Sequence, residues 1–146
     1  MFFSKSFGYA LRGTLYVAMM SDENRKIRID EIASRLSVPR HFLGKIMNKV
    51  AKKTILDSSK GPHGGFSLNA TTLNTSILSI VEATDGLEKF DSCVLRLKKC
   101  NPEYPCPLHY LMGSYKTDLV TVLTGTNIGS LLKENIPDFI RSIAAV

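Results

Sequence analysis

The chain has 146 residues and a net charge of +6, with 44% hydrophobic and 22% charged residues. This length and composition predict one compact globular domain, alone or with an appended arm, and exclude a disordered or fibrous protein. The apolar start of the chain is interrupted by Lys5 and Arg12, so it predicts neither a secretion signal nor a membrane span. We therefore expect a cytoplasmic protein without membrane contacts.

The positive charge is concentrated in the first half of the sequence. Residues 1–70 contain 12 lysines and arginines against five aspartates and glutamates, and the excess peaks between Arg35 and Lys60. Such a charge is typical of a protein that binds a polyanion, nucleic acid first, but a solvated basic face has the same charge. The arrangement of the residues has to decide between these interpretations.

Three helices are predicted at the start of the chain. Apolar spacing predicts one helix over about 4–20, and a polar connector leads to a second helix that ends near Leu36. Pro39 predicts the start of a third helix. Its buried face would carry Phe42, Leu43, Ile46, Met47 and Val50, and its other face Arg40, His41, Gly44, Lys45, Asn48, Lys49 and Lys52.

The second and third of these helices predict a helix-turn-helix unit, because the second member has a basic, amide-bearing outer face. Arginine and lysine donate to guanine edges or phosphates, and asparagine is suited to adenine. A purely structural helical hairpin would show the same apolar spacing. It would have little reason to lack acids on its outer face, and none occurs between Glu31 and Asp57. We expect DNA contacts from Arg40, His41, Lys45, Asn48, Lys49 and Lys52.

A glycine-rich hairpin is predicted next, with strands at Ile55–Leu56 and Phe66–Leu68 joined by the tip KGPHGG. A basic hairpin directly after a recognition helix is typical of a wing, which lies along the DNA backbone or minor groove. We expect these contacts from Lys60, Gly61, His63, Gly64 and Gly65. For direct base contact by His41 or His63, an ordinary exposed histidine is the favoured alternative.

All three cysteines lie in CVLRLKKCNPEYPCPLH, with the spacing Cys93-x6-Cys100-x5-Cys106-x2-His109. In a reducing compartment, three thiols and an imidazole predict a set of four metal ligands before a disulfide. Thiolates favour iron–sulfur clusters, zinc or copper(I), and imidazole suits iron and zinc. A predicted helix with Pro107 in its first turn would hold Cys106 near the positive end of its dipole and His109 close by.

Cys93, Cys100, Cys106 and His109 also fit roles other than an iron–sulfur site. A closed structural zinc site uses the same Cys3His set, and the spacing does not exclude it. Unligated core cysteines fit less well, because KKCNPEYPCP is polar and rich in proline. His109 can also be a plain helix-surface residue. In a thiolate-ligated cluster, Arg96, Lys98 and Lys99 would offset part of the negative charge.

The helix after Cys106 predicts a dimer. Its apolar stripe contains Leu108, Leu111, Met112, Tyr115, Leu119, Val122 and Leu123. Such a stripe packs on its own domain or on a second copy, and pairing is the better interpretation beside a small DNA-binding module. A further helix is expected from about Asn127, followed by a tail that is broken before Pro137.

Four segments together carry a family resemblance: SKSFGYALRGTLYVA, IDEIASRLSVPRHFLGKIMNKV, KGPHGGFSL and ILSIVEATDG. In this order they resemble the IscR/NsrR-type winged-helix regulators of bacteria, the Rrf-two family. The resemblance weakens beyond about residue 125. It implies a homodimeric transcription factor on a pseudo-palindromic operator in double-stranded DNA, with the recognition helix in the major groove and the wing near the minor groove.

The resemblance also implies that Cys93, Cys100 and Cys106 are cluster ligands, with His109 as the best fourth candidate. Six residues separate the first cysteine pair, where five are commoner in the family. Some members use an acid near the N-terminus of the partner subunit as the fourth ligand, but Gly8 stands at that position here. A 2Fe–2S cluster is favoured by analogy, whereas three cysteines with an external ligand would point to 4Fe–4S.

The expected fold is mainly α with a small β-hairpin: a winged helix-turn-helix domain over residues 1–85, a cysteine-rich metal-binding loop over 86–109, and a dimerisation helix with a C-terminal tail over 107–146. The expected function is a redox-sensing regulator, such as a repressor, whose operator binding depends on the cluster. The alternative is a winged-helix regulator with structural zinc or no metal that answers to a protein partner or another signal. No catalytic signature occurs, so we do not expect an enzyme.

Overall fold

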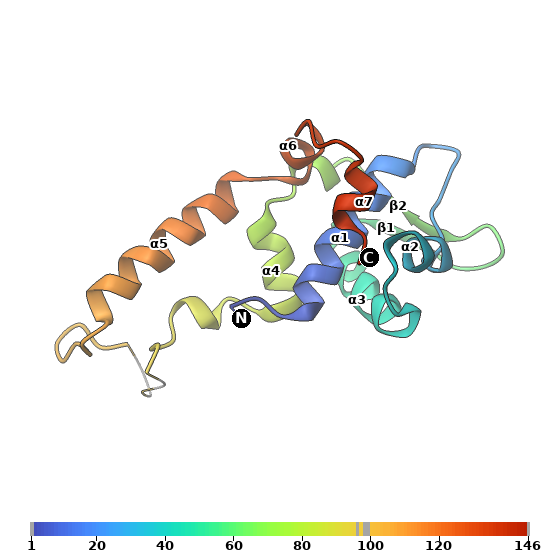
Figure 1. The fold of residues 1–146 in the computed structure, drawn as a ribbon. Helices are drawn as coiled ribbons and strands as arrows, with labels where there is room; N and C mark the ends of the chain where they lie inside the picture. Colours follow the sequence, from blue (N-terminus) through green and yellow to red (C-terminus); the bar gives the residue numbers. More distant parts are fainter. Residues whose placement is uncertain (1, 96, 98–99, 146) are drawn as a thin grey trace.

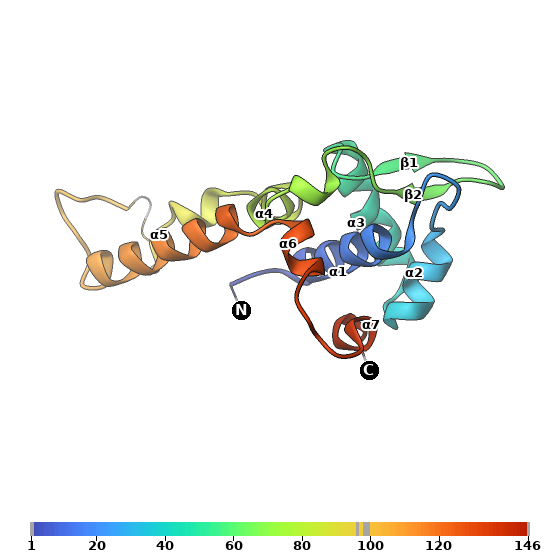
Figure 2. The same cartoon turned by 90° about the horizontal axis from the view of Figure 1, so that it is seen from above.

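The computed structural model describes residues 2–95, 97 and 100–145. Its elements follow in the order α1 (Lys5–Met20), α2 (Ile29–Leu36), α3 (Arg40–Lys52), β1 (Asp57–Ser59), β2 (Gly65–Ser67), η1 (Thr72–Asn74), α4 (Ile77–Asp85), η2 (Glu88–Phe90), α5 (His109–Gly125), α6 (Ile128–Leu132) and α7 (Phe139–Ile143). The β1–β2 hairpin projects from one end of the molecule, and α5 with the loop before it projects from the other (Figures 1 and 2). The expected mainly helical winged-helix fold is confirmed.

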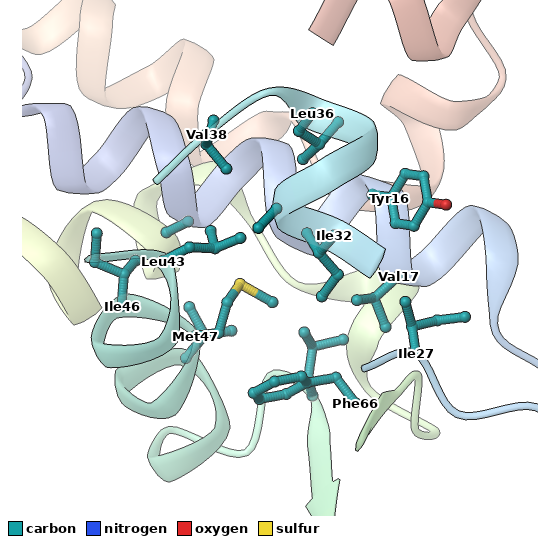
Figure 3. Close-up of a cluster of buried hydrophobic side chains, with 14 of the residues drawn as sticks. Tyr16, Val17, Ile27, Ile32, Leu36, Val38, Leu43, Ile46, Met47 and Phe66 are labelled. Carbon is teal, nitrogen blue, oxygen red and sulfur yellow. The ribbon is translucent and has the colours of Figure 1, made fainter. Parts of the chain in front are cut away.

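A helix-turn-helix unit forms as the sequence predicts. The turn after α2 contains Ser37 in the left-handed conformation, and Pro39 precedes the first residue of α3 as its N-cap. Both α2 and α3 pack on α1 around one hydrophobic core (Figure 3). The inward row of α3 consists of Leu43, Ile46, Met47 and Val50.

Phe42 does not belong to that row, so its predicted place in the core is wrong. Its side chain is 59% exposed. On an α-helix each residue lies about 100° further around the axis. The buried face of α3 is centred near Leu43 and Val50. Phe42 lies about 100° around the helix axis from Leu43, so it falls at the edge of this face.

The two strands of the wing also differ from the expectation. Ile55 and Leu56 are buried and precede β1, which begins at Asp57. Both side chains pack in the core at the base of the wing. Their apolar character therefore reflects burial and not strand pairing, which is made by backbone groups. β1 and β2 are antiparallel, with Ser58 opposite Phe66.

A second hydrophobic cluster joins α5 to the body of the domain. Leu123 of α5 and Ile128 of α6 pack with Leu15 of α1 and with Ile77 and Val81 of α4. This contact holds the C-terminal end of α5, while its N-terminal end lies far from the helix-turn-helix (Figure 1). Among the described residues, no helix is long and apolar enough to cross a bilayer.

The tail after Pro137 contains a short helix that the sequence pattern did not single out. This helix is α7, which packs on α2 beside the chain terminus (Figure 2). Ile140 and Ile143 lie against the first hydrophobic cluster, and the backbone N–H of Ala145 donates to Leu36 O at 2.7 Å. Two apolar residues three positions apart are enough for one helical turn to bury a stripe, but too few to be recognised as a helix from sequence.

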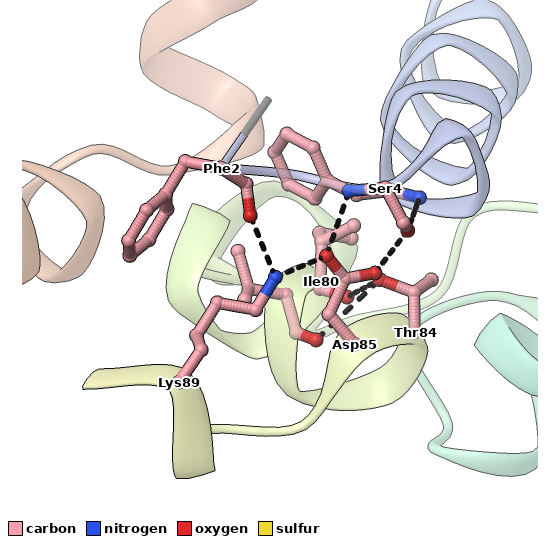
Figure 4. Close-up of polar contacts among 8 residues, drawn as sticks. Phe2, Ser4, Ile80, Thr84, Asp85 and Lys89 are labelled. Carbon is pink, nitrogen blue, oxygen red and sulfur yellow. Dashed lines mark hydrogen bonds and ion pairs between the residues drawn. The ribbon is translucent and has the colours of Figure 1, made fainter. Parts of the chain in front are cut away.

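A partly buried ion pair anchors the start of α1 to the end of α4 (Figure 4). Lys89 Nζ lies 2.6 Å from Asp85 Oδ2 and donates to Phe2 O at 3.0 Å. The backbone N–H of Ser4 donates to Asp85 Oδ2 at 2.9 Å, and its hydroxyl donates to Oδ1. Desolvation raises the pKa of Asp85, but the hydrogen bonds from Lys89 and Ser4 outweigh it and lower the pKa to about 2.

We expect Asp85→Asn to destabilise the protein by about 2 kcal/mol at pH 7, because the Asp85 side chain is only 3% exposed and the variant leaves Lys89 without its counter-charge. A carboxyl whose pKa is lowered on folding contributes stability above its unfolded pKa and loses it as the pH falls through the folded value. The difference between wild type and variant should therefore be constant above about pH 5. It should shrink as the pH falls from about 4 towards 2.

Urea unfolding of both proteins at a series of pH values measures this difference. Asp91→Asn is the matched control, because Asp91 is an exposed acid on the same segment. A difference that grows as the pH falls would contradict the role given to Asp85.

Candidate DNA-binding surface and metal centre

The outer face of α3 presents the predicted row of polar side chains. Arg40, His41, Lys45, Asn48, Lys49 and Lys52 are all exposed. Arg40 Nε forms an ion pair with Asp30 of α2, which the sequence did not predict because the two residues lie on different helices. The pair is exposed on both sides, so solvent screens it and a phosphate can compete for the guanidinium.

The wing presents Lys60, Gly61 and His63 to solvent, but it buries Gly64. A Cβ atom on Gly64 would come within 2.3 Å of Ser59 O, so this glycine permits the tight turn rather than offering a surface. Gly65 is half-buried and its φ is +146°, a conformation that favours glycine. Of the five predicted wing residues, three are therefore exposed to solvent.

Ile27 and Arg28, which precede α2, position the wing, and no sequence pattern predicted this role. The backbone N–H of Ile27 donates to Phe66 O at 2.7 Å, and that of Phe66 donates to Ile27 O at 2.8 Å. Arg28 Nη1 donates to Pro62 O at 2.9 Å in the tip. No local pattern could have revealed the Arg28 contact, because its partner lies 34 positions further along the chain.

A cleft of about 350 Å³ lies between α3 and the wing. Gly44 and Asn48 line its α3 side, and Lys60 lines its wing side. A Cβ atom on Gly44 would meet only Ile29 Cγ1, at 3.9 Å, so the absence of a side chain at Gly44 keeps this cleft open. The cleft thus lies between the outer face of α3 and the wing, with polar or basic side chains on both of its sides.

The second candidate site is a cavity of about 540 Å³ between α5 and the segment that follows α4. All four predicted ligands line it: Cys93, Cys100, Cys106 and His109. Cys93 is buried, Cys106 and His109 are half-buried, and Cys100 is exposed. α5 begins at His109, so Pro107 precedes the helix instead of lying in its first turn as predicted.

The four side chains form two pairs. Cys93 Sγ lies 3.9 Å from Cys106 Sγ, and Cys100 Sγ lies 3.1 Å from His109 Nδ1. Two thiolates bound at about 2.3 Å to one tetrahedral metal ion are separated by about 3.8 Å, so the Cys93–Cys106 distance suits a shared ion. In the described part of the chain, no three Cys, His, Asp or Glu side chains converge on one point.

The surroundings of Cys93 favour a thiolate. A hydrogen bond from the backbone of Leu95 lowers the pKa of the Cys93 thiol, against the opposing effect of desolvation, and the charge of Lys116 on α5 lowers it further. Lys116 also lines the cavity and donates to Ser92 O. Arg96, Lys98 and Lys99, which the sequence suggested as counter-charges, lie outside the described residues.

A basic recognition helix followed by a wing defines a winged-helix DNA-binding protein. The sequence profile of the Rrf2 family, described as an iron-dependent transcriptional regulator, matches residues 3–134. The chain therefore belongs to the Rrf2 (Rrf-two) family and is a transcriptional regulator, in a family whose relatives are regulators and not enzymes.

Individual relatives agree with this assignment. An HTH-type transcriptional regulator of Aquifex aeolicus is 34% identical over 134 residues, which cover 90% of this chain and 92% of that protein. The regulator IscR of Vibrio campbellii is 27% identical over 128 residues, covering 87% and 74%. The structure of CymR, the global cysteine regulator of B. subtilis, superimposes with a TM-score of 0.72 at 19% identity, covering 88% of this chain and 94% of CymR, which shows the shared fold alone.

Proposed function

We propose that this regulator is a homodimer that binds a pseudo-palindromic operator and whose affinity for DNA is set by an iron–sulfur cluster. Cys93, Cys100 and Cys106 would hold the cluster, with His109 as the fourth ligand. The observation that carries the proposal is that these four side chains, spread over 17 positions of the sequence, line one cavity. The matching family is described as iron-dependent, which supports iron as the metal.

The pairing of the ligands supports a 2Fe–2S cluster. Cys93 with Cys106, and Cys100 with His109, would each hold one of two iron positions, and four protein ligands is the number that such a cluster takes. The cluster would supply a redox-active and chemically labile group. The chain supplies the four donors and the hydrogen bond that favours the Cys93 thiolate.

The position of the cavity suggests how its occupancy would reach the DNA-binding surface. Cys93 follows η2, which leads from α4, and His109 begins α5. α4 packs on both α1 and α3, and Leu123 of α5 joins the cluster formed with α1 and α4. Ligation of both ends of the loop would fix α5 relative to α4, and loss of a ligand would release it. Linkage requires DNA to change cluster stability to the same degree that the cluster changes DNA affinity.

The dimer would form through α5. Of the predicted apolar stripe, Met112, Leu119 and Leu123 turn towards the cavity and the body of the domain. Leu111, Tyr115 and Val122 remain exposed on a neighbouring side of the helix. Two such stripes packed against each other would give the twofold symmetry that a pseudo-palindromic operator requires.

Metal analysis and visible absorption of protein purified without oxygen test this proposal. We expect a coloured wild-type protein with iron and acid-labile sulfide in equal amounts. The spectrum should shift in His109→Ala, since a ligand to one iron is exchanged, and colour should be lost in Cys106→Ser. Tyr104→Ala is the control, because Tyr104 is 81% exposed in the same loop and should leave the spectrum unchanged.

A colourless protein with one zinc ion per chain would contradict the cluster. The residues 93–109 would then be a structural zinc loop, and the regulator would respond to a protein partner or another signal. That outcome would leave the DNA-binding surface as described.

A further inference from the structure

We infer that Phe42 contacts the 5-methyl group of a thymine in the major groove and so determines one base of each operator half-site. This inference rests on the recognition-helix role of α3 in the proposed function. The packing, the position and the surroundings of Phe42 carry it.

Phe42 lies outside the hydrophobic core of the described residues. Its ring is 59% exposed and is not among the side chains that pack on either hydrophobic cluster of the described residues. Its aromatic neighbour is His41, whose ring centroid lies 6.0 Å away in an edge-on arrangement. Other side chains of the winged-helix domain that are both large and apolar are less exposed, such as Leu73 at 42%.

The position of Phe42 on α3 suits base contact. It is the third residue of a helix that begins at Arg40, and the N-terminal residues of a recognition helix are those that reach base edges. Lys45 lies three residues further on, so the two side chains are neighbours on the helix surface.

The surroundings of Phe42 select DNA as the occupant. Its exposed neighbours on α3 are His41, which contacts its ring, and Lys45, and the α3 sequence contains no acid. A large apolar side chain surrounded by basic side chains is poorly suited to contact an apolar protein surface. Such a contact would also remove the neighbouring charges from water. In the major groove, the thymine methyl is an apolar group beside the anionic backbone, and phenylalanine is one of the side chains that contact it.

The test begins with selection of duplexes from a random library by wild-type protein. Affinity is then measured for the selected duplex and for versions in which single thymines are replaced symmetrically by deoxyuridine, which lacks the methyl group. We expect Phe42→Ala to weaken binding of the thymine duplex by roughly threefold to tenfold. Replacement of one particular thymine should weaken wild-type binding similarly, and both changes together should cost no more than either alone.

Control variants separate contact from folding. Leu73→Ala should bind and select like wild type, and Phe42→Leu should keep part of the preference for thymine. Phe42→Ala should unfold at the wild-type urea concentration and sediment as wild type does. A lower unfolding midpoint would give Phe42 a packing role, and a change of oligomeric state would place it in a subunit interface; either result would overturn the inference.

Two further results would overturn the inference. The first is an affinity of Phe42→Ala that equals that of wild type; the second is that the loss from Phe42→Ala and the loss from removing a methyl group are independent at every thymine. In these cases wild-type protein still selects a sequence, so operator binding itself stands. If wild-type protein enriches no sequence, sequence-specific operator binding fails, and the thymine contact fails with it.

Discussion

Gly65→Ala is expected to disable the wing. Gly65 has a φ of +146°, and an added Cβ would lie 2.7 Å from Ile27 O and 2.9 Å from the carbonyl carbon of Ile27. Those atoms are backbone, and Ile27 is paired with Phe66 through two hydrogen bonds, so relief of the clash requires this pairing to open. We expect a loss of about 2–4 kcal/mol in unfolding free energy and at least a tenfold loss of DNA affinity.

Gly61→Ala is the matched control for this prediction. Gly61 lies in the same wing with a positive φ of +96°, but among the described residues nothing lies within 4 Å of its added Cβ. Gly61→Ala should lower the unfolding free energy only by the cost of a positive φ for alanine, about 1 kcal/mol. Urea unfolding and titration with a labelled operator duplex measure both quantities. Equal effects of the two substitutions would show that the Ile27 contact does not hold the wing.

Tyr115→Asp is expected to separate the subunits of the proposed dimer and thereby to remove one of its two half-site contacts. Tyr115 is 52% exposed in the stripe with Leu111 and Val122, and a carboxylate there would be buried without a partner in a dimer. A monomer engages one half-site and loses the effective concentration supplied by its partner. We therefore expect operator affinity to fall by roughly 100-fold or more.

Thr124→Asp is the control for the dimer, because Thr124 is exposed two positions after Val122 and thus on the opposite side of α5. It adds the same charge and should remain dimeric. Sedimentation equilibrium gives the subunit state, and titration with the full operator and with an isolated half-site gives the affinities. A Tyr115→Asp protein that remains dimeric would place the subunit interface elsewhere than on this stripe.

Local patterns in the sequence determined much of the protein. Helical spacing and Pro39 were sufficient for α2 and α3, and the glycines of KGPHGG for the wing, because backbone conformation there depends on neighbours in the chain. Residue type and spacing were enough to single out the four candidate donors, which the structure brings to one cavity; their role as metal ligands stays a prediction. Family membership was predicted from the four segments of the winged-helix domain that resemble the Rrf2 family, and it was confirmed.

Tertiary structure decided everything that depends on contacts between distant positions. Helical periodicity could not tell whether Phe42, at the boundary of the buried face, lies inside or outside, because the direction of the core is set by how α3 packs on α1. The same holds for the hydrogen bond from Arg28 to the wing tip and for the docking of α7 on α2. The division of the donors into the pairs Cys93–Cys106 and Cys100–His109 is likewise a result of the fold. Sequence spacing limits how far apart two donors can lie, but only the packed chain decides which of them meet.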